Sequence, residues 1–338
     1  MSENQLMATT ADRVMVPGYR HHPGNHCGST ALRNLLGFHG VEISEEMAFG
    51  LGAGACFFYV VLEDASPSRF TNGRAAKLEE GFLELTGAPL RLRTDDDPDR
   101  SWELAREVVD GGRPALLLTD LYYLDHYGKS AHFPGHAVVL AGYDDERAWL
   151  SDTGFEELQT TALANLAKAR HSKQPVFQLA GHAIDVPDAG ALDAAGLIAA
   201  APAAIERAAR EMVEPSLGEY QGIPALRRLA AEIGDWPSAA EDWQWCARFL
   251  YQVIERRGTG GGNFRRMYSR FLAEVGREEA GLAADAAELW TSLATAAHAA
   301  SERERAAPDL WRDLAARAEL VREAEERLWE SLLPPSAD

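Results

Sequence analysis

The spacing of hydrophobic and polar residues changes character near residue 190. Before that point, segments with apolar residues at every third or fourth position, which predict helices, alternate with short apolar runs that predict strands. After Pro187 the composition shifts to Ala, Glu, Arg and Leu at helical spacing, almost without strand signals up to Pro334. We therefore expect an α+β domain over residues 14–188 and a mostly α-helical domain over residues 189–335.

Apolar spacing and glycine or proline breakers define the individual elements. In the first domain, the predicted helices are 27–37, a short segment from Ser44, 74–86, 102–110 and 161–171. The predicted strands are 56–62, 89–93, 114–118 and 176–186, and residues 1–14 are expected to be a frayed polar end. In the second domain, helices are predicted at 192–213, 223–234, 238–257, 263–276, 279–300 and 309–331.

A β-hairpin is predicted for residues 135–154, which read GHAVVLAGYDDERAWLSDTG. If its turn is centred on Asp144, His136 lies directly opposite Asp152. Paired residues on one face have Cβ atoms roughly 4.5–5.5 Å apart, so the carboxylate could hold the imidazole. A slip of one residue would move Asp152 to the other face, which makes this register a sharp prediction.

Composition indicates an ordinary soluble globular protein, since 46% of the residues are hydrophobic and 25% are charged. No apolar run reaches membrane-spanning length, and the N-terminal MSENQLMATTADR lacks the order of a signal peptide, so we expect a cytoplasmic protein without a membrane partner. The net charge of −19 disfavours nucleic acid as a partner. It would suit a cationic substrate, or serve solubility alone.

Three cysteines, Cys27, Cys56 and Cys246, are too few and too widely spaced for a disulfide framework or a CxxC metal site. Cys27 stands at the predicted start of a helix. The unpaired N–H groups and the positive end of the helix dipole there favour thiolate over thiol, and the thiolate is the nucleophile. The alternative interpretation of Cys27 is a small buried hydrophobic residue.

A thiol nucleophile needs a base, and the base needs a third group that sets its tautomer. Cys27, His136 and Asp152 supply these three roles in the order helix start, strand start and end of the next strand. Ten histidines make a chance combination easy, so the joint fit of these positions, rather than the residue types, favours a catalytic triad.

The motifs NHCGSTALRNLL, GHAVVLAGY and AWLSDTG resemble the papain-like cysteine-peptidase arrangement, and more closely the family of the butirosin biosynthesis protein H acyltransferase. The resemblance extends to SEEMAFGLGAG and GTGGGNFRRMYSRFL. It implies a papain-like N-terminal region with a helical C-terminal one. It also implies cysteine-dependent acyl transfer from a carrier-protein thioester to an amine in natural-product biosynthesis, with Cys27, His136 and Asp152 as the triad.

The resemblance therefore implies an acyl carrier protein as donor partner, a small-molecule amine as acceptor, and a phosphopantetheine-carried substrate with no bound cofactor. Two alternatives remain open: a hydrolase with the same triad, either a peptidase or a thioesterase, and a catalytically silent binding module. The sequence does not specify the acyl group, the acceptor, the pathway or the oligomeric state.

The chain departs from papain-like peptidases around the nucleophile. The glutamine expected a few residues before it is missing, and His21, His22 and Asn25 occupy that neighbourhood. Asp152 stands where these peptidases usually carry Asn, and Thr153 follows where they carry Trp. We expect the backbone N–H of Cys27 and the side chain of Asn25 or His22 to bind the oxyanion.

Three further stretches are candidates for substrate binding. Glycines before the predicted strand 56–62 could let a ligand approach the backbone, although the pattern favours a tight turn. A Tyr-containing loop at 120–133 could cover a cleft, and RRGTGGGNFRRMYSR (256–270) could hold an anion or an acidic carrier, or be a linker with solvated arginines. The candidate residues are Gly52, Gly54, Tyr122, Tyr123, Thr259, Gly260, Asn263 and Arg265.

A zinc site is conceivable where His21, His22, His26 and Cys27 cluster, but no second group of conventional spacing completes four ligands. We therefore predict no metal.

Overall fold

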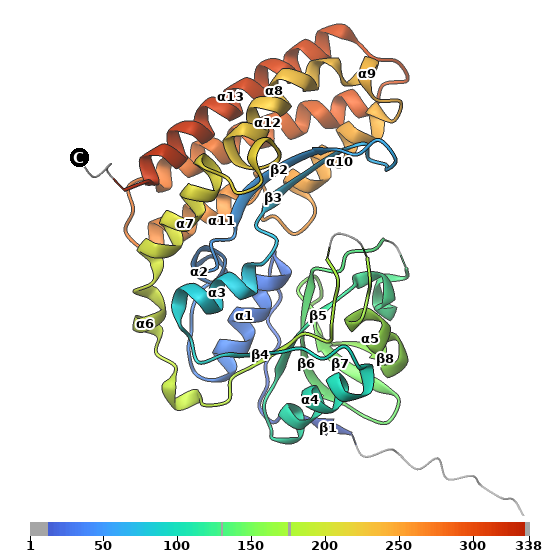
Figure 1. Ribbon diagram of the computed structural model, residues 1–338, viewed down its shortest axis with the longest axis vertical. Helices are drawn as coiled ribbons and strands as arrows, with labels where there is room; N and C mark the ends of the chain where they lie inside the picture. Colours follow the sequence, from blue (N-terminus) through green and yellow to red (C-terminus); the bar gives the residue numbers. More distant parts are fainter. Residues whose placement is uncertain (1–12, 130, 175–176, 335–338) are drawn as a thin grey trace, which may run out of the picture. The chain divides into compact units, whose positions relative to one another are not determined.

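The computed structural model describes residues 13–129, 131–174 and 177–334. The chain forms two compact units (Figure 1). Unit 1 comprises the chain up to Glu42 and Pro89–Leu192, and unit 2 comprises Ile43–Ala88 and the chain from Asp193. The chain crosses between the units three times, and the predicted boundary at 188/189 lies close to the third crossing, at Leu192/Asp193. The segment 43–88, expected in the first domain, packs with the helical part.

In the described part of unit 1, seven strands form one antiparallel sheet in the order β4-β9-β5-β6-β7-β8, with β1 paired to β6. This confirms the α+β class. The strands are β1 (Val14–Met15), β4 (Arg91–Arg93), β5 (Ala115–Thr119), β6 (His136–Tyr143), β7 (Arg147–Ser151), β8 (Gln159–Ala162) and β9 (Ala183–Asp185).

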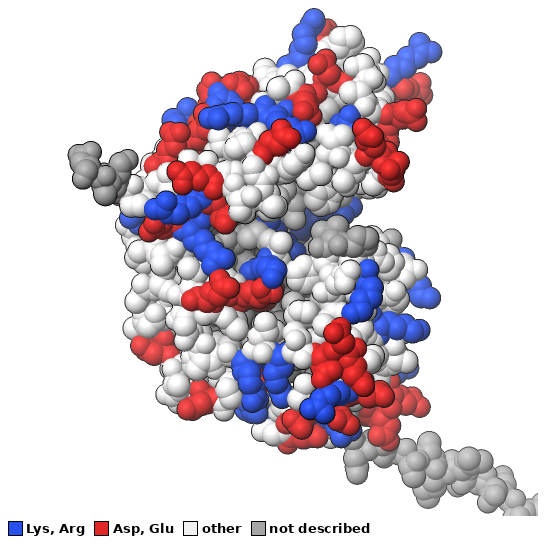
Figure 2. Space-filling model, in the orientation of Figure 1, with Lys and Arg blue, Asp and Glu red and all other residues white. Residues whose placement is uncertain are grey.

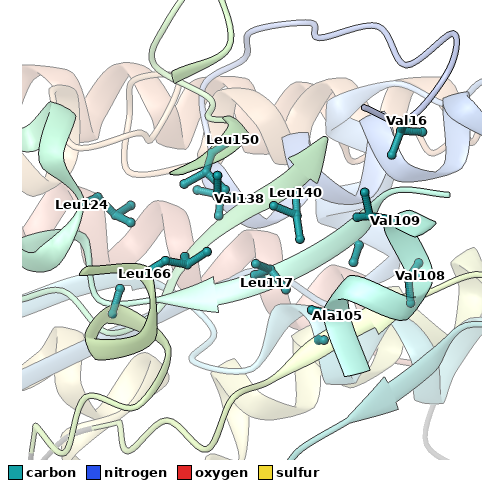
Figure 3. Packing of buried hydrophobic residues seen from close by; sticks show 14 residues of the cluster. Val16, Ala105, Val108, Val109, Leu117, Leu124, Val138, Leu140, Leu150 and Leu166 are labelled. Carbon is teal, nitrogen blue, oxygen red and sulfur yellow. The ribbon is translucent and has the colours of Figure 1, made fainter. Parts of the chain in front are cut away.

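The helices of unit 1 are α1 (Cys27–Phe38), α4 (Pro98–Asp110) and α5 (Leu163–Arg170), with single turns η1 (Leu121–Tyr123), η2 (Asp125–Tyr127) and η3 (Ala189–Ala191). Helix α1 packs on β6 and β5. One core cluster joins Val138, Leu140 and Leu150 of the sheet with side chains of α4 and α5 (Figure 3). These buried contacts fix the helix that carries Cys27 and the strand that carries His136 in one packed unit.

The β6–β7 hairpin forms, but its register differs from the prediction. The last pair of the ladder is Val139 with Ser151. Asp152, the next residue after β7, therefore lies opposite Val138 rather than opposite His136. The prediction of direct pairing was therefore wrong by two residues. Because two residues are one full side-chain period, Asp152 still lies on the face of His136 and reaches it diagonally.

The turn explains the shift. The N–H of Asp144 donates to the carbonyl of Arg147, so the turn is centred beyond Asp144. An irregularity between Leu140 and Gly142 then shifts the pairing back by one residue, which leaves a net displacement of two residues. Neither feature has a signal in the alternation of apolar residues.

Two other predictions for unit 1 need correction. The predicted helix 161–171 begins at Leu163, because Thr160 and Thr161 pair with β7 as part of β8. The predicted strand 176–186 is confirmed only as the three residues of β9, and Val176, like residues 1–12, lies outside the described residues.

Unit 2 combines a two-stranded hairpin with helices (Figure 1). The hairpin is β2 (Ala55–Val61) and β3 (Arg69–Arg74). The helical elements are α2 (Glu45–Leu51), α3 (Leu78–Thr86), α6 (Ala194–Ile198), α7 (Ala201–Val213), η4 (Gly218–Tyr220), α8 (Gly222–Glu232), η5 (Ile233–Asp235), α9 (Trp236–Ala239), α10 (Trp243–Glu255), α11 (Arg265–Glu274), α12 (Ala280–Ser301) and α13 (Pro308–Leu332).

The predicted helices after residue 190 are confirmed in type, with two split into shorter pieces. The prediction for 74–86 was wrong at its start, because Arg74 closes β3 and α3 begins at Leu78. Strand β3 escaped prediction because Phe70 is its one large apolar residue. Its pairing with β2 depends on backbone hydrogen bonds, which carry no sequence signal.

Acidic and basic side chains are interspersed on the face drawn in Figure 2, without one dominant field of either sign. None of the described helices combines the length and the apolar character needed to cross a membrane.

Candidate active site

Cys27 is the first residue of α1, as predicted. The imidazole of His26 caps the helix by accepting the N–H of Ser29 at 3.3 Å. The opposite side of the helix buries Leu32 and Leu35 completely, which fixes its rotation. Cys27 is half-buried, and its Sγ lies 3.8 Å from the carbonyl oxygen of Gly135, the residue before β6.

His136 opens β6 and pairs with Thr119 of β5. Its Nε2 lies 3.0 Å from Oδ2 of Asp152, which leaves Nδ1 for the thiol of Cys27. Burial lowers the pKa of His136, but the charge and hydrogen bond of Asp152 and those of Cys27 outweigh it and raise the pKa to about 10. The surroundings of this buried ring therefore favour an imidazolium beside a thiolate.

Asp152 follows β7 and is completely buried. Burial raises the pKa of its carboxyl, but the charge of His136 and hydrogen bonds from His126 and His136 hold it well below the usual range. Nε2 of His126 lies 2.9 Å from Oδ2, and the hydroxyl of Tyr127 donates to Oδ1 at 3.1 Å. Asp152 is thus an ionised acceptor with three side-chain donors.

The position upstream of the nucleophile is occupied by a structural histidine. Nδ1 of His21 lies 2.7 Å from Oγ of Ser151, and its Nε2 lies 2.7 Å from the carbonyl oxygen of Phe155. Both ring nitrogens therefore tie the segment before α1 to the end of β7. His22 and Asn25 are exposed, and their role as oxyanion donors stays a prediction.

A buried carboxylate, that of Asp120, holds the loop after β5 in place. Asp120 is fully buried and accepts hydrogen bonds from the N–H groups of Tyr122 and Phe133, from Nδ1 of His132 and from the hydroxyl of Ser172. Burial raises the pKa of Asp120, but these donors outweigh it and lower the pKa.

The two tyrosines of this loop have ordinary packing partners. The ring of Tyr122 stacks on His132 with 4.0 Å between centroids, and Tyr123 packs against the core cluster of unit 1. Their role in substrate binding stays a prediction.

The candidate glycines of unit 2 are buried by close packing. A Cβ on Gly52 would lie 2.7 Å from the carbonyl oxygen of Leu78, and one on Gly54 would lie 2.6 Å from Cδ1 of the same leucine. The structure thus assigns both glycines to the contact between α2 and α3, and neither offers an open backbone to a ligand.

The glycine-rich loop before α11 is a connection between helices. The hydroxyl of Thr259 donates to the carbonyl of Ile254, the backbone N–H of Asn263 donates to the same oxygen, and both side chains are buried. Gly260 has a φ of +66°, which favours glycine. Asn263 and the next residue also have positive φ values, so the predicted helix 263–276 begins only at Arg265.

Arg265 is completely buried, contrary to its prediction as a ligand for an anionic partner. Its guanidinium pairs with Glu325 at 2.8 Å and donates to the carbonyls of Cys56 and Gly73. The N–H groups of Trp290 and Trp329 also donate to Glu325. The predicted basic patch was therefore wrong for this residue, which is part of the core of unit 2.

The remaining cysteines are unsuited to nucleophilic attack. Cys56 is 2% exposed, and burial raises the pKa of its thiol to about 12. Cys246 is fully buried, and burial likewise raises its pKa. Among the described residues, no group of three or more His, Cys, Asp or Glu side chains is arranged to hold a metal ion.

Two family models match the chain, and together they span most of it. One, described as butirosin biosynthesis protein H, N-terminal, matches residues 26–153, and the other, described as a domain of unknown function (DUF4872), matches residues 164–332. Residues 26–153 thus belong to the butirosin biosynthesis protein H N-terminal family, and residues 164–332, half of the chain, belong to the DUF4872 family. Unit 1 has the predicted papain-like arrangement: a cysteine-bearing helix packs against an antiparallel sheet, His136 opens β6, and Asp152 directly follows the adjacent strand β7.

A solved crystal structure described as that of a C39-like peptidase from Bacillus anthracis is similar to this chain at 16% sequence identity and a TM-score of 0.36. The similarity covers 51% of this chain and 96% of that chain. No curated protein matches the chain.

Sequence reasoning missed His126 and Tyr127, which contact Asp152, and His21, which contacts Ser151. His126 and Tyr127 lie in a polar loop without periodicity. The one signal that could have found them is topological. The loop follows β5 and Asp152 follows β7, and both strands end at the side of the sheet where β6 begins.

Proposed function

We propose that this family member is a cysteine acyltransferase that moves an acyl group from a thioester to an amine. The observation that carries the proposal is the arrangement of Cys27, His136 and Asp152. The buried carboxylate of Asp152 holds the imidazole of His136 beside the thiol of Cys27 at the start of α1. Membership of the butirosin biosynthesis protein H-like family supports transfer in natural-product biosynthesis, with a phosphopantetheine-carried acyl group as substrate.

In the first half-reaction, the thiolate of Cys27 attacks the thioester carbonyl and forms a tetrahedral intermediate. Its collapse forms the acyl–Cys27 bond and breaks the bond to the donor sulfur. The departing thiolate takes a proton from the imidazolium of His136. The oxyanion is bound by the N–H of Cys27 at the start of α1, with Asn25 or His22 as the second donor.

In the second half-reaction, the amine attacks the acyl–Cys27 carbonyl while Nδ1 of His136 takes one of its protons. The C–S bond breaks, the amide is released, and Cys27 and His136 return to thiolate and imidazolium. Asp152 stays ionised throughout, because its donors stabilise the charged form.

The test uses acyl-pantetheine thioesters of graded chain length and a panel of small primary amines. Intact-protein mass spectrometry should show one acyl group on wild-type protein and none on Cys27→Ala, with Cys246→Ala as a matched control that keeps the adduct. Adding a suitable amine should convert the adduct to amide faster than water hydrolyses it.

Two outcomes would contradict transfer. An adduct that decays to free acid at a rate independent of every amine would identify a hydrolase. Absence of any adduct, together with a Cys27 thiol that alkylates no faster than a model thiol, would identify a catalytically silent binding module.

A further inference from the structure

Asp152 has more hydrogen-bond donors than orientation of one imidazole requires. Oδ2 is shared by Nε2 of His136 at 3.0 Å and Nε2 of His126 at 2.9 Å, and Oδ1 accepts the hydroxyl of Tyr127 at 3.1 Å. The imidazole of His126 is 6% exposed. Two histidines therefore compete for one oxygen of a buried carboxylate.

The surroundings of His126 fix the roles of its two ring nitrogens. Its Nδ1 is buried and has no hydrogen-bond partner among the residues that the structure describes. A proton on that nitrogen would be a buried donor without an acceptor, which is costly. Nε2 is therefore the ring nitrogen that donates a proton to Asp152.

Tyr127 is also held in its donor form. Burial and the charges of Asp152 and Cys27 raise the pKa of its hydroxyl well above the usual range. Asp152 thus faces His136 from β6 and His126 and Tyr127 from η2, while Cys27 of α1 acts on His136 and Tyr127.

The turn that carries the two extra donors is anchored. The carboxylate of Asp125 accepts the N–H of Ala162, the hydroxyl of Thr161 and the amide of Asn165, at 2.7, 3.2 and 2.6 Å. The ring of His126 packs edge-on against Phe155 with 5.1 Å between centroids. His126 and Tyr127 are consequently held against Asp152 by contacts on both sides.

We propose that His126 and Tyr127 are positioning residues that share the negative charge of Asp152 and so keep His136 able to release its proton. This inference rests on the acid–base role of His136 in the proposed function. Each additional donor on a carboxylate weakens the hold of that carboxylate on a neighbouring imidazolium. A general acid works best when its pKa approaches the operating pH. Without these two donors, the carboxylate of Asp152 would raise the pKa of His136 further above that pH.

The experiment measures the protonation of His136 directly, by NMR titration of protein with isotope-labelled histidine. The resonance of His136 is identified by its loss in His136→Gln. His126→Phe keeps a ring against Phe155 but removes the donor, and we expect the titration midpoint of His136 to rise by about one pH unit. Tyr127→Phe should raise it less. His126→Gln, whose amide can replace the Nε2 donor, should stay near wild type.

An unchanged or lower midpoint in folded His126→Phe would overturn the proposal. So would an equal rise in His126→Gln, which would assign the effect to ring shape. If His126→Phe does not fold, Tyr127→Phe decides the question by the same criterion. The titration needs no acyl substrate, so a wild-type protein that transfers no acyl group refutes the proposed function without altering this readout.

Discussion

At the scale of single residues, environment rather than residue type separates the three cysteines. Cys56 and Cys246 are buried, and burial raises the pKa of both thiols. Cys27 is half-buried at a helix start and faces an imidazole whose pKa is raised to about 10. The thiolate, which is the reactive form, is thus favoured at one position.

We therefore expect iodoacetamide to modify the folded protein at Cys27 alone. Peptide mapping should find the adduct on the peptide containing Cys27, with a rate at pH 6–7 at least about tenfold above that of a free cysteine. Cys27→Ala should leave the protein unmodified until urea exposes the other thiols. Equal modification of Cys246 in the folded state would contradict this account.

The raised pKa of His136 also links folding to pH. Its pKa is about 10 in the folded protein against 6.5 for an ordinary histidine. The stabilisation from its proton is complete below about pH 6.5 and is lost as the pH rises through 10. Asp152, with a lowered pKa, stays ionised over that window.

We expect the free energy of unfolding of wild-type protein to fall towards that of His136→Gln between pH 6.5 and 10. Urea unfolding at four or five pH values across the window measures the difference. His39→Gln, which changes a partly exposed histidine of unit 1, serves as the control. A difference that stays constant with pH would show that His136 is neutral in the folded protein.

The sequence predicted the residues whose positions follow from local patterns, and it missed those whose positions depend on packing. Cys27 followed from a helix start, and the contact of His136 with Asp152 followed from period-two alternation. The contacts of His126 and Arg265 could not be predicted, because a loop without periodicity and a buried guanidinium both take their partners from remote segments.

At the scale of elements, the start of α1 determines where the thiol lies. Its N-cap is His26, whose imidazole accepts the N–H of Ser29, although Ser, Thr, Asp and Asn are the usual caps. The same backbone turn places Cys27 at the first helical position. Stability of the cap and position of the nucleophile are therefore coupled.

Replacing His26 by Ala should cost about 1 kcal/mol of unfolding free energy and slow alkylation of Cys27, because the first turn loosens. His26→Asn, which restores a capping oxygen, should recover most of both. Thermal unfolding and iodoacetamide kinetics on the same samples measure the two effects. Slow alkylation in His26→Asn with full stability would instead give the imidazole a direct role at the thiol.

The ion pair of Arg265 and Glu325 ties α11 to α13, and Trp290 of α12 joins it. Breaking a buried pair leaves a charge without a partner, which costs about 3–5 kcal/mol. Arg265→Met should therefore lower the stability of unit 2 by that order, measured by urea unfolding. Arg266→Ala changes a partly exposed neighbour and should cost about 0.5 kcal/mol or less.

A stable Arg265→Met protein that lost only its affinity for an acyl donor would restore the sequence-based interpretation of this arginine. The double variant Arg265→Met/Glu325→Leu should recover part of the lost stability, since no unpaired charge then remains.

At the scale of the whole chain, the two units are not consecutive in sequence. Segment 43–88 belongs to unit 2, where Phe49 stacks on Phe264 and Phe57 packs on Trp290 at centroid distances of 5.4 and 5.3 Å. The sequence could not show this, because the hydrophobic pattern of 43–88 indicates burial without indicating the partner. The composition shift near residue 190 marked only one of the three crossings.

A chain truncated after Leu192 should consequently fail as an independent domain, although it retains Cys27, His136 and Asp152. Segment 43–88 would expose Phe49, Phe57, Tyr59 and Phe82, all 1% exposed or less in the full chain. Large exposed apolar surface drives aggregation. We expect insoluble protein, or a soluble one without a cooperative thermal transition.

Replacing 43–88 in that chain by a flexible Gly/Ser linker should restore solubility, because it removes the exposed apolar side chains and leaves the sheet of unit 1 intact. A cooperative transition and rapid Cys27 alkylation in the simple truncation would show instead that 43–88 folds without the helices that follow residue 193.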